Sequence, residues 1–206
     1  MILSVQNPVP DLAETIAQRS LADRGAAYAA EVRRLLDAGL ELMGQAGTDS
    51  RPRVADIVAA AGLSNDAFYR HFPSKDAFVA ALLEDGTQRL RSYLAHQMGK
   101  ERDPAGQIRR WVEGVLSQAA DVELASSTKA VLWNGRSATD HLALAGPSTL
   151  LATLLEEPLA ALGREDPALD AALVGHAVVG RMSEHLSHGT RPNRAETERI
   201  VAFCLS

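Results

Sequence analysis

The sequence has little of what would build a disulfide-linked, membrane-embedded or secreted protein. Its 206 residues include one cysteine, Cys204, so no disulfide can form within the chain. No charge-free apolar run reaches the roughly 18 residues that a membrane span requires, so none is expected. Residues 1–20 lack the positive start and continuous apolar core of a secretory signal. We therefore expect a cytoplasmic protein.

Aromatic residues are also scarce, at 4% of the chain, and alternating β-branched runs are few. Alanine and leucine are abundant instead, and apolar residues recur at helical spacing in many places. The sequence therefore predicts an all-α fold. A chain of this length allows one or two domains and can bury a core without disulfides.

The formal net charge of −5 at first counts against a nucleic-acid partner. Its distribution is uneven, because the segment from Arg19 to Leu83 holds eight Lys and Arg against eight Asp and Glu. The segment from Glu84 to Ser206 holds thirteen against sixteen. Any positive surface on the first segment must be local, which predicts modest non-specific affinity for DNA.

Residues 51–76 predict two short helices joined by a tight turn. Apolar residues recur at helical spacing through the first helix, at Val54, Ile57, Val58 and Ala61. Gly62 then ends this helix, because glycine accepts the left-handed backbone that a helix end commonly needs. A helix, a glycine turn and a second short helix form the pattern of a DNA-binding helix-turn-helix.

The second of these helices, predicted over residues 65–72, is the candidate recognition helix. Ser64 is a natural N-cap for it, and Pro73 ends it. Phe68 and Phe72 anchor the helix inward. Asn65, Asp66 and Arg70 can then face outward as candidate base contacts, because Asn pairs with adenine and Arg with guanine in the major groove.

Three segments of this stretch resemble the TetR family of bacterial transcriptional regulators: residues 56–58, 61–64 and 68–76. The resemblance implies an N-terminal arm over residues 1–24 and a helix-turn-helix DNA-binding domain over 25–73. A helical regulatory and dimerisation domain would occupy residues 74–206. The alternative is an ordinary helical bundle that resembles the family by accident.

The resemblance also assigns contacts to the DNA backbone. Tyr69 and His71 match family positions that commonly touch phosphates, although His71 could instead have a structural role. Lys75 starts the next helix, where free N–H groups and the helix dipole already favour an anion. The further candidates are Arg53, where the family often has threonine, and Ser64.

Asp66 and Ala67 depart from the family pattern. The family usually has a small residue at the first position and often a hydroxylic one at the second. An acid near phosphates is unfavourable unless it accepts from a cytosine amino group. Asp66 could instead stabilise the start of the helix, and both interpretations stay open.

Outside the motif, residues 28–45 predict the first firm helix, and residues 13–24 either a helix or a mobile arm. Residues 74–97 predict the long helix that follows the motif, and residues 137–147 an irregular stretch. Further helices are predicted over residues 108–125, 129–134, 149–161, 166–188 and 194–205.

Candidate residues for an effector pocket lie in the C-terminal part: Trp111, Trp133, Asn134 and His141. The apolar stripes of these helices are more typical of a core than of a ligand cavity. The resemblance implies a homodimer formed by the last two helices of each subunit. Its candidate interface residues are Leu173, Gly175, Ala177, Gly180, Ile200 and Phe203, with tight packing inside one subunit as the alternative.

Taken together, the resemblance implies a homodimeric regulator, a repressor, on a pseudo-palindromic double-stranded DNA operator. A small-molecule effector would release it. We expect no cofactor and no enzyme activity. We expect no metal either, because nothing completes a ligand set around His176, His185 and His188. The rival hypothesis is a helical ligand-binding or protein-interaction module that has lost specific DNA binding.

Overall fold

The computed structural model describes residues 11–135 and 145–206, and within them every regular element is a helix. The N-terminal helices are α1 (Leu12–Ala46), α2 (Val54–Ala61), α3 (Asn65–His71) and α4 (Lys75–Met98). The remaining helices are α5 (Pro104–Ala120), α6 (Val122–Gly135), α7 (Ala145–Ala152), a 3-10 turn η1 (Thr153–Leu155), α8 (Glu156–Ala161), α9 (Pro167–His188) and α10 (Arg194–Leu205). The predicted all-α fold is confirmed.

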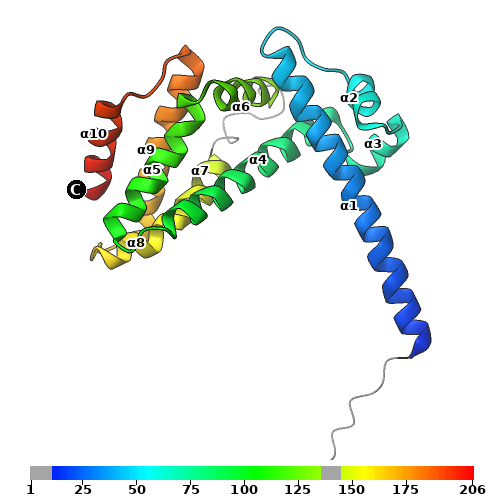
Figure 1. Cartoon of the computed structure of the whole chain (residues 1–206), viewed down its shortest axis with the longest axis horizontal. Helices are drawn as coiled ribbons and strands as arrows, with labels where there is room; N and C mark the ends of the chain where they lie inside the picture. The colour runs from blue at the N-terminus through cyan, green and yellow to red at the C-terminus, as the bar shows by residue number, and fades with distance from the viewer. Residues whose placement is uncertain (1–10, 136–144) are drawn as a thin grey trace, which may run out of the picture.

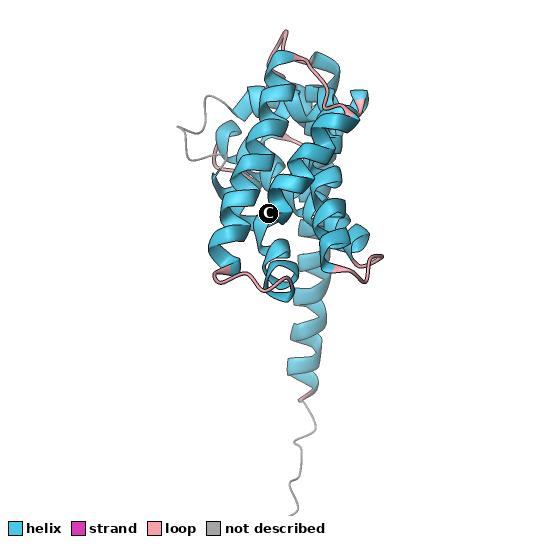
Figure 2. Ribbon diagram, turned by 90° about the vertical axis from the view of Figure 1, so that its left-hand side faces the viewer, coloured by secondary structure: helices cyan, strands magenta, loops and turns pink. Residues whose placement is uncertain are grey.

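The helices form two groups that the long helix α4 connects (Figure 1). The helices α1 to α3 lie at one end of the molecule, and α9 and α10 lie at the other. The N-terminal half of α1 projects away from the rest of the chain, as both views show (Figures 1 and 2). Within the described residues, none of the helices has the length and apolarity to span a bilayer.

The first helix is longer than the one predicted over residues 28–45. It begins at Leu12, where the Asp11 carboxylate accepts a hydrogen bond from the Ala13 amide at 3.4 Å. Gly25 lies within the helix without ending it. A single internal glycine costs only about 1 kcal/mol against alanine, which is too little to break a long helix.

The first core holds the helix-turn-helix together. The rings of Phe68, Phe72 and Phe78 pack against one another with centroids 5.1–5.6 Å apart, and all three side chains are buried. The same core contains Ala130 and Val131 of α6. The helix α6, although it lies in the C-terminal part of the chain, therefore helps to bury the N-terminal core.

The second core joins α4 and α5 to the helices that follow. Trp111 lies at its centre with no exposed surface, and its indole N–H donates to the Leu151 carbonyl at 3.0 Å. Gly114 of α5 lies against Leu94 of α4, where an added Cβ would come within 2.4 Å of a Leu94 methyl carbon. A larger residue at this crossing would therefore force the Leu94 side chain to move.

Two predicted helices are divided in the structure, since the stretch over residues 149–161 falls into α7, η1 and α8. The stretch expected as one helix over residues 108–125 ends at Ala120, and α6 begins at Val122. The Asp121 carboxylate accepts from the amides of Glu123 and Leu124 at 2.9 and 3.0 Å, so it caps the new helix. Residues 137–144 of the stretch predicted as irregular lie outside the described residues, and α7 begins at Ala145.

Candidate nucleic-acid interface

The turn between α2 and α3 is closed by Gly62. Its backbone has φ 65° and ψ 37°, the left-handed conformation that favours glycine. The Leu63 amide donates to the Val58 carbonyl at 2.9 Å, which satisfies an acceptor at the end of α2. Space around Gly62 is open, so the backbone angle rather than crowding requires glycine here.

The short helix α3 has a buried inner side and an open outer side. The Ser64 hydroxyl accepts from the Ala67 amide at 3.1 Å and starts the helix. Phe68 has no exposed surface, whereas Tyr69 is 57% exposed. Asn65 is exposed as well. Seven residues alone make a marginal helix in water, so the inner anchors hold the outer residues in place.

Asp66 is exposed in the first turn of α3. This position suits an acid that complements the helix dipole. It also leaves the carboxylate free to meet a base edge, so both interpretations of the sequence stay open. Ala67, the second departure from the family pattern, is buried and faces the core rather than DNA.

A local positive site lies where α4 begins. The Ser74 hydroxyl caps α4 by accepting from the Ala77 amide at 3.0 Å, and Lys75 follows, half-buried. Burial and the charge of Arg51 lower the pKa of Lys75. The Arg51 guanidinium lies over the Trp133 ring, 4.8 Å from its centroid. Two neighbouring cations beside a helix start would be stabilised by an anion such as a phosphate.

Arg53 sits at the other end of the motif, just before α2. Its backbone amide donates to the Asp56 carboxylate at 2.9 Å, and the residue is exposed. Ser64 is exposed too, but its hydroxyl already accepts a hydrogen bond as the α3 cap. A hydroxyl can still donate to a phosphate oxygen while it accepts.

Arg70 and His71 are held by a carboxylate from α1. Nη2 of Arg70 and Nε2 of His71 each lie 2.7 Å from the same oxygen of Glu31. The His71 side chain has no exposed surface, which favours the structural role left open by the sequence over a phosphate contact. The hydrogen bonds from His71 and Arg70 lower the pKa of Glu31.

Sequence reasoning missed two residues of this interface. Arg51 lies two positions before a predicted contact, and its charge within the motif could have identified it. Glu31 had no such signal, because it is separated from Arg70 by 39 positions and lies in a helix predicted only to pack.

The four residues predicted to line an effector pocket are dispersed. Trp111 belongs to the C-terminal core, and Trp133 stacks under Arg51. Asn134 is buried and donates to the Ala130 carbonyl at 2.9 Å, while its amide oxygen has no partner among the described residues. His141 lies outside the described residues. Trp111 thus has the core role that the sequence left open.

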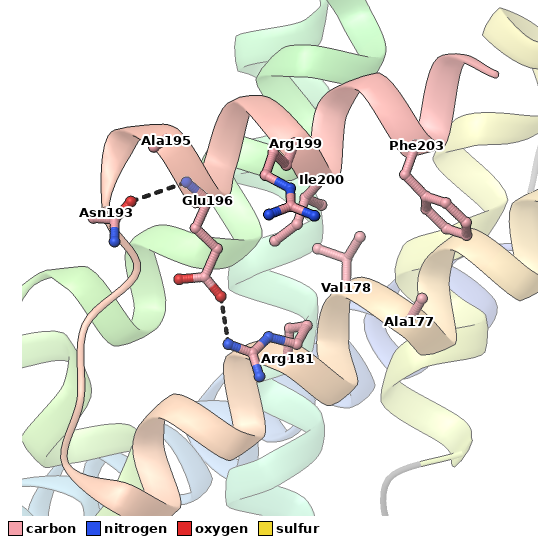
Figure 3. A pocket seen from close by; sticks show the side chains of 9 residues that line it. All are labelled: Ala177, Val178, Arg181, Asn193, Ala195, Glu196, Arg199, Ile200 and Phe203. Carbon is pink, nitrogen blue, oxygen red and sulfur yellow. Dashed lines mark hydrogen bonds and ion pairs between the residues drawn. The ribbon is translucent and has the colours of Figure 1, made fainter.

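The predicted dimer residues fall on one face of α9 and α10, with one exception. Leu173 and Phe203 are 61% and 64% exposed, and the space around Gly180 is open. Ala177 and Ile200 line a hollow of about 570 Å³ between the two helices, which Figure 3 shows.

The exception is Gly175, which faces the interior of its own subunit. An added Cβ there would lie 2.6 Å from the Ala152 Cβ and 3.2 Å from the Ser148 carbonyl oxygen. This glycine is therefore required by packing of α9 against α7, the alternative that the sequence left open.

Residues 35–82 match the family model described as "Bacterial regulatory proteins, tetR family". This range covers the C-terminal end of α1, the helix-turn-helix and the start of α4. No curated protein matches the chain.

Solved structures share the fold over most of the chain. A putative TetR-family transcriptional regulator from Mesorhizobium loti is 18% identical with a TM-score of 0.63, over 86% of this chain and 94% of that one. A putative TetR-family regulator from Rhodococcus is 22% identical with a TM-score of 0.60, over 86% and 95%. FadR from Bacillus subtilis, solved in complex with stearoyl-CoA, is 16% identical with a TM-score of 0.57, over 84% and 97%. The chain thus carries a helix-turn-helix that matches the TetR family model, within a fold that these solved regulators share.

Proposed function

We propose that this protein is a repressor that binds a pseudo-palindromic operator as a homodimer and leaves it when a small molecule binds. The observation that carries the proposal is the two-sided character of α3. Phe68 anchors the inner side with no exposed surface, while Asn65 and Tyr69 stay open to solvent on the outer side. A helix so presented can enter a major groove.

In this proposal the outer residues divide their roles. Asn65, near the start of α3, reads adenine, and Arg70 reads guanine. Tyr69 and Lys75 donate to phosphates, which sets the position of the helix without reading sequence. Arg53 and Ser64 add backbone contacts at the edges of the motif.

The dimer would form through α9 and α10. Three large apolar side chains are exposed on this face, namely Leu169, Leu173 and Phe203, at 54%, 61% and 64%. Exposed apolar side chains gathered on one face favour a protein interface. A two-fold axis through this face would present two copies of α3 to one duplex, so the operator would carry two inverted half-sites.

The effector would bind among the C-terminal helices, in an apolar site with a few polar groups. The neighbouring FadR structure, which contains stearoyl-CoA, supports a small ligand for this fold. The buried and unpaired amide oxygen of Asn134 is the polar group we assign to the effector. Release requires that the effector bind one state of the dimer more tightly than the other.

The test begins with an operator obtained by selection from random duplexes. We expect Asn65→Ala to relax the preference at one position of each half-site. The double variant Tyr69→Ala, Lys75→Ala should weaken binding to all duplexes alike. The contact assignment fails if the double variant leaves operator affinity unchanged.

The rival function, a helical module without specific DNA binding, has support in the exposed acid Asp66 and the charge balance of the N-terminal segment. The selection discriminates between the two. A clean dimer that enriches no sequence would favour the rival, whereas an enriched two-fold motif would exclude it.

A further inference from the structure

Glu31 connects α1 to the end of the recognition helix at a single point. One of its carboxylate oxygens lies 2.7 Å from Nη2 of Arg70 and 2.7 Å from Nε2 of His71. The Glu31 side chain is 28% exposed, so this oxygen sits at the margin of the protein rather than in its core. Two consecutive residues of α3 thus share one acceptor on another helix.

His71 is held in place by its hydrogen bond to Glu31 and by its burial. An ionised carboxylate only accepts, so Nε2 of His71 must carry the proton and donate to Glu31. The ring has no exposed surface and packs edge-on against Tyr28, with centroids 4.2 Å apart. The hydrogen bond from the buried His71 ring therefore holds the Glu31 carboxylate in one position.

The Arg70 side chain, unlike the buried ring of His71, is 55% exposed. Its contact with Glu31 uses Nη2, and a guanidinium has five N–H donors in a rigid fork. Donors on the remaining nitrogens stay available for a second acceptor. A carboxylate that already holds one nitrogen of the guanidinium reduces the freedom lost when the remaining donors bind a base.

We propose that Glu31 is a positioning residue for DNA recognition, which orients Arg70 toward the base that it reads. The inference rests on the proposed function, since it requires an operator that the protein distinguishes from other duplexes. It adds that the preference at one base pair depends on an α1 carboxylate that itself contacts no base. The same carboxylate repels phosphates, so it favours the correct site at the expense of general affinity.

The experiment compares Glu31→Ala and Arg70→Ala with a matched control, Glu41→Ala. Glu41 also lies on α1, where its carboxylate accepts from Gln45 at 3.2 Å. Each variant is titrated against the selected operator, against operators changed at single positions, and against a scrambled duplex. Thermal unfolding is followed for each, and Glu31→Gln replaces Glu31→Ala if the latter unfolds below the assay temperature.

We expect Arg70→Ala to reduce the preference at one position by about tenfold or more. Glu31→Ala should reduce it at the same position, by a smaller factor, without weakening binding to the scrambled duplex. It should add nothing in the Arg70→Ala background, because residues in one network are not additive. Glu41→Ala should change neither quantity.

The possible outcomes separate the two proposals. If the wild-type chain selects no operator, the proposed function fails, and with it the basis of this inference. The inference alone fails if the operator is found but Arg70→Ala alters no single position. It also fails if Glu31→Ala weakens operator and scrambled duplex equally, which would indicate a purely structural role.

Discussion

Burial and the nearby charge of Arg51 lower the pKa of Lys75, in a segment whose Lys and Arg equal its Asp and Glu in number. Lys75 begins α4, which adds the free amides of a helix N-terminus. Together they make the start of α4 a candidate anion site, although the carboxylates of Asp76 and Asp56 also lie near Lys75. Counting charges over the whole segment could not find it, because proximity decides its strength.

The first prediction concerns Lys75. Replacing Lys75 by alanine should weaken operator and non-specific duplexes by similar factors. The slope of log affinity against log salt should fall by about 0.9 for each phosphate that the variant no longer neutralises. Fluorescence anisotropy titrations over a range of salt concentrations measure this slope. An unchanged slope would mean that Lys75 does not contact phosphate.

The lowered pKa of Lys75 gives a second prediction with a defined sign. Only the protonated amine binds phosphate well, and this amine loses its proton at a lower pH than a free lysine does. Operator affinity should therefore decline on the alkaline side earlier in the wild type than in Lys75→Arg, since arginine stays charged. Parallel affinity curves for the two proteins on the alkaline side would contradict this.

Individual side chains differ in how far the sequence could place them. The exposure of Asn65 and Tyr69 follows from helical spacing once Phe68 is assigned to the core. The burial of His71 does not, because it depends on Glu31 and Tyr28, which lie about forty residues away. The local spacing of apolar residues determines which side of a helix faces the core. Hydrogen bonds between residues distant in the sequence determine which polar side chains are already paired.

At the scale of elements, helix ends with chemical signals were predicted to within a few residues. Gly62, Ser64 and Pro73 each mark a boundary of α2 or α3 by backbone angle or capping. The start of α1 had a weaker signal, because the only break shortly before Tyr28 is one glycine. The division at Asp121 was missed, since an aspartate can either cap a helix or lie within one.

The third prediction uses two glycines of α9. Gly175→Ala should destabilise the protein, because the new methyl would meet the Ala152 Cβ and a backbone carbonyl of α7. The expected loss is about 1–3 kcal/mol of unfolding free energy, as for other overpacked sites. Urea denaturation measures this loss.

Gly180→Ala is the matched control, because an added Cβ there would meet no atom of another described element within 4 Å. In the monomer it should be neutral or stabilising by up to about 1 kcal/mol, through helix propensity. Equal losses for both variants would mean that α7 does not pack against α9 as described. A loss of dimer in Gly180→Ala alone would instead identify a close approach between subunits.

At the scale of the molecule, α6 belongs to both cores. Ala130 and Val131 are buried with α1 and the helix-turn-helix, while Leu132 packs against the C-terminal core. Trp133 adds a contact to Arg51 at the start of the DNA-binding motif. A movement of the C-terminal helices would therefore reach the N-terminal domain through α6 as well as through α4.

The fourth prediction concerns the α9–α10 face. Phe203→Glu should abolish the dimer without unfolding the subunit, because the side chain is 64% exposed. The variant should bind the operator much more weakly, since each half-site then binds alone, but bind a scrambled duplex with less change. Sedimentation velocity gives the oligomeric state, and anisotropy gives the affinities.

Leu12→Glu is the control, because Leu12 is 71% exposed on the projecting part of α1, away from this face. It should leave the dimer intact. A Phe203→Glu protein that still sediments as a dimer would show that subunits associate through another surface.

The measurement that tests the account most directly is selection of bound sequences from random duplexes by the wild-type chain. We predict an enriched motif with two inverted half-sites whose centres are about one helical turn, or a multiple of it, apart. Asn65→Ala should change one position in each half-site. Enrichment of no motif, or of a single unpaired half-site, would contradict a paired recognition helix reading DNA.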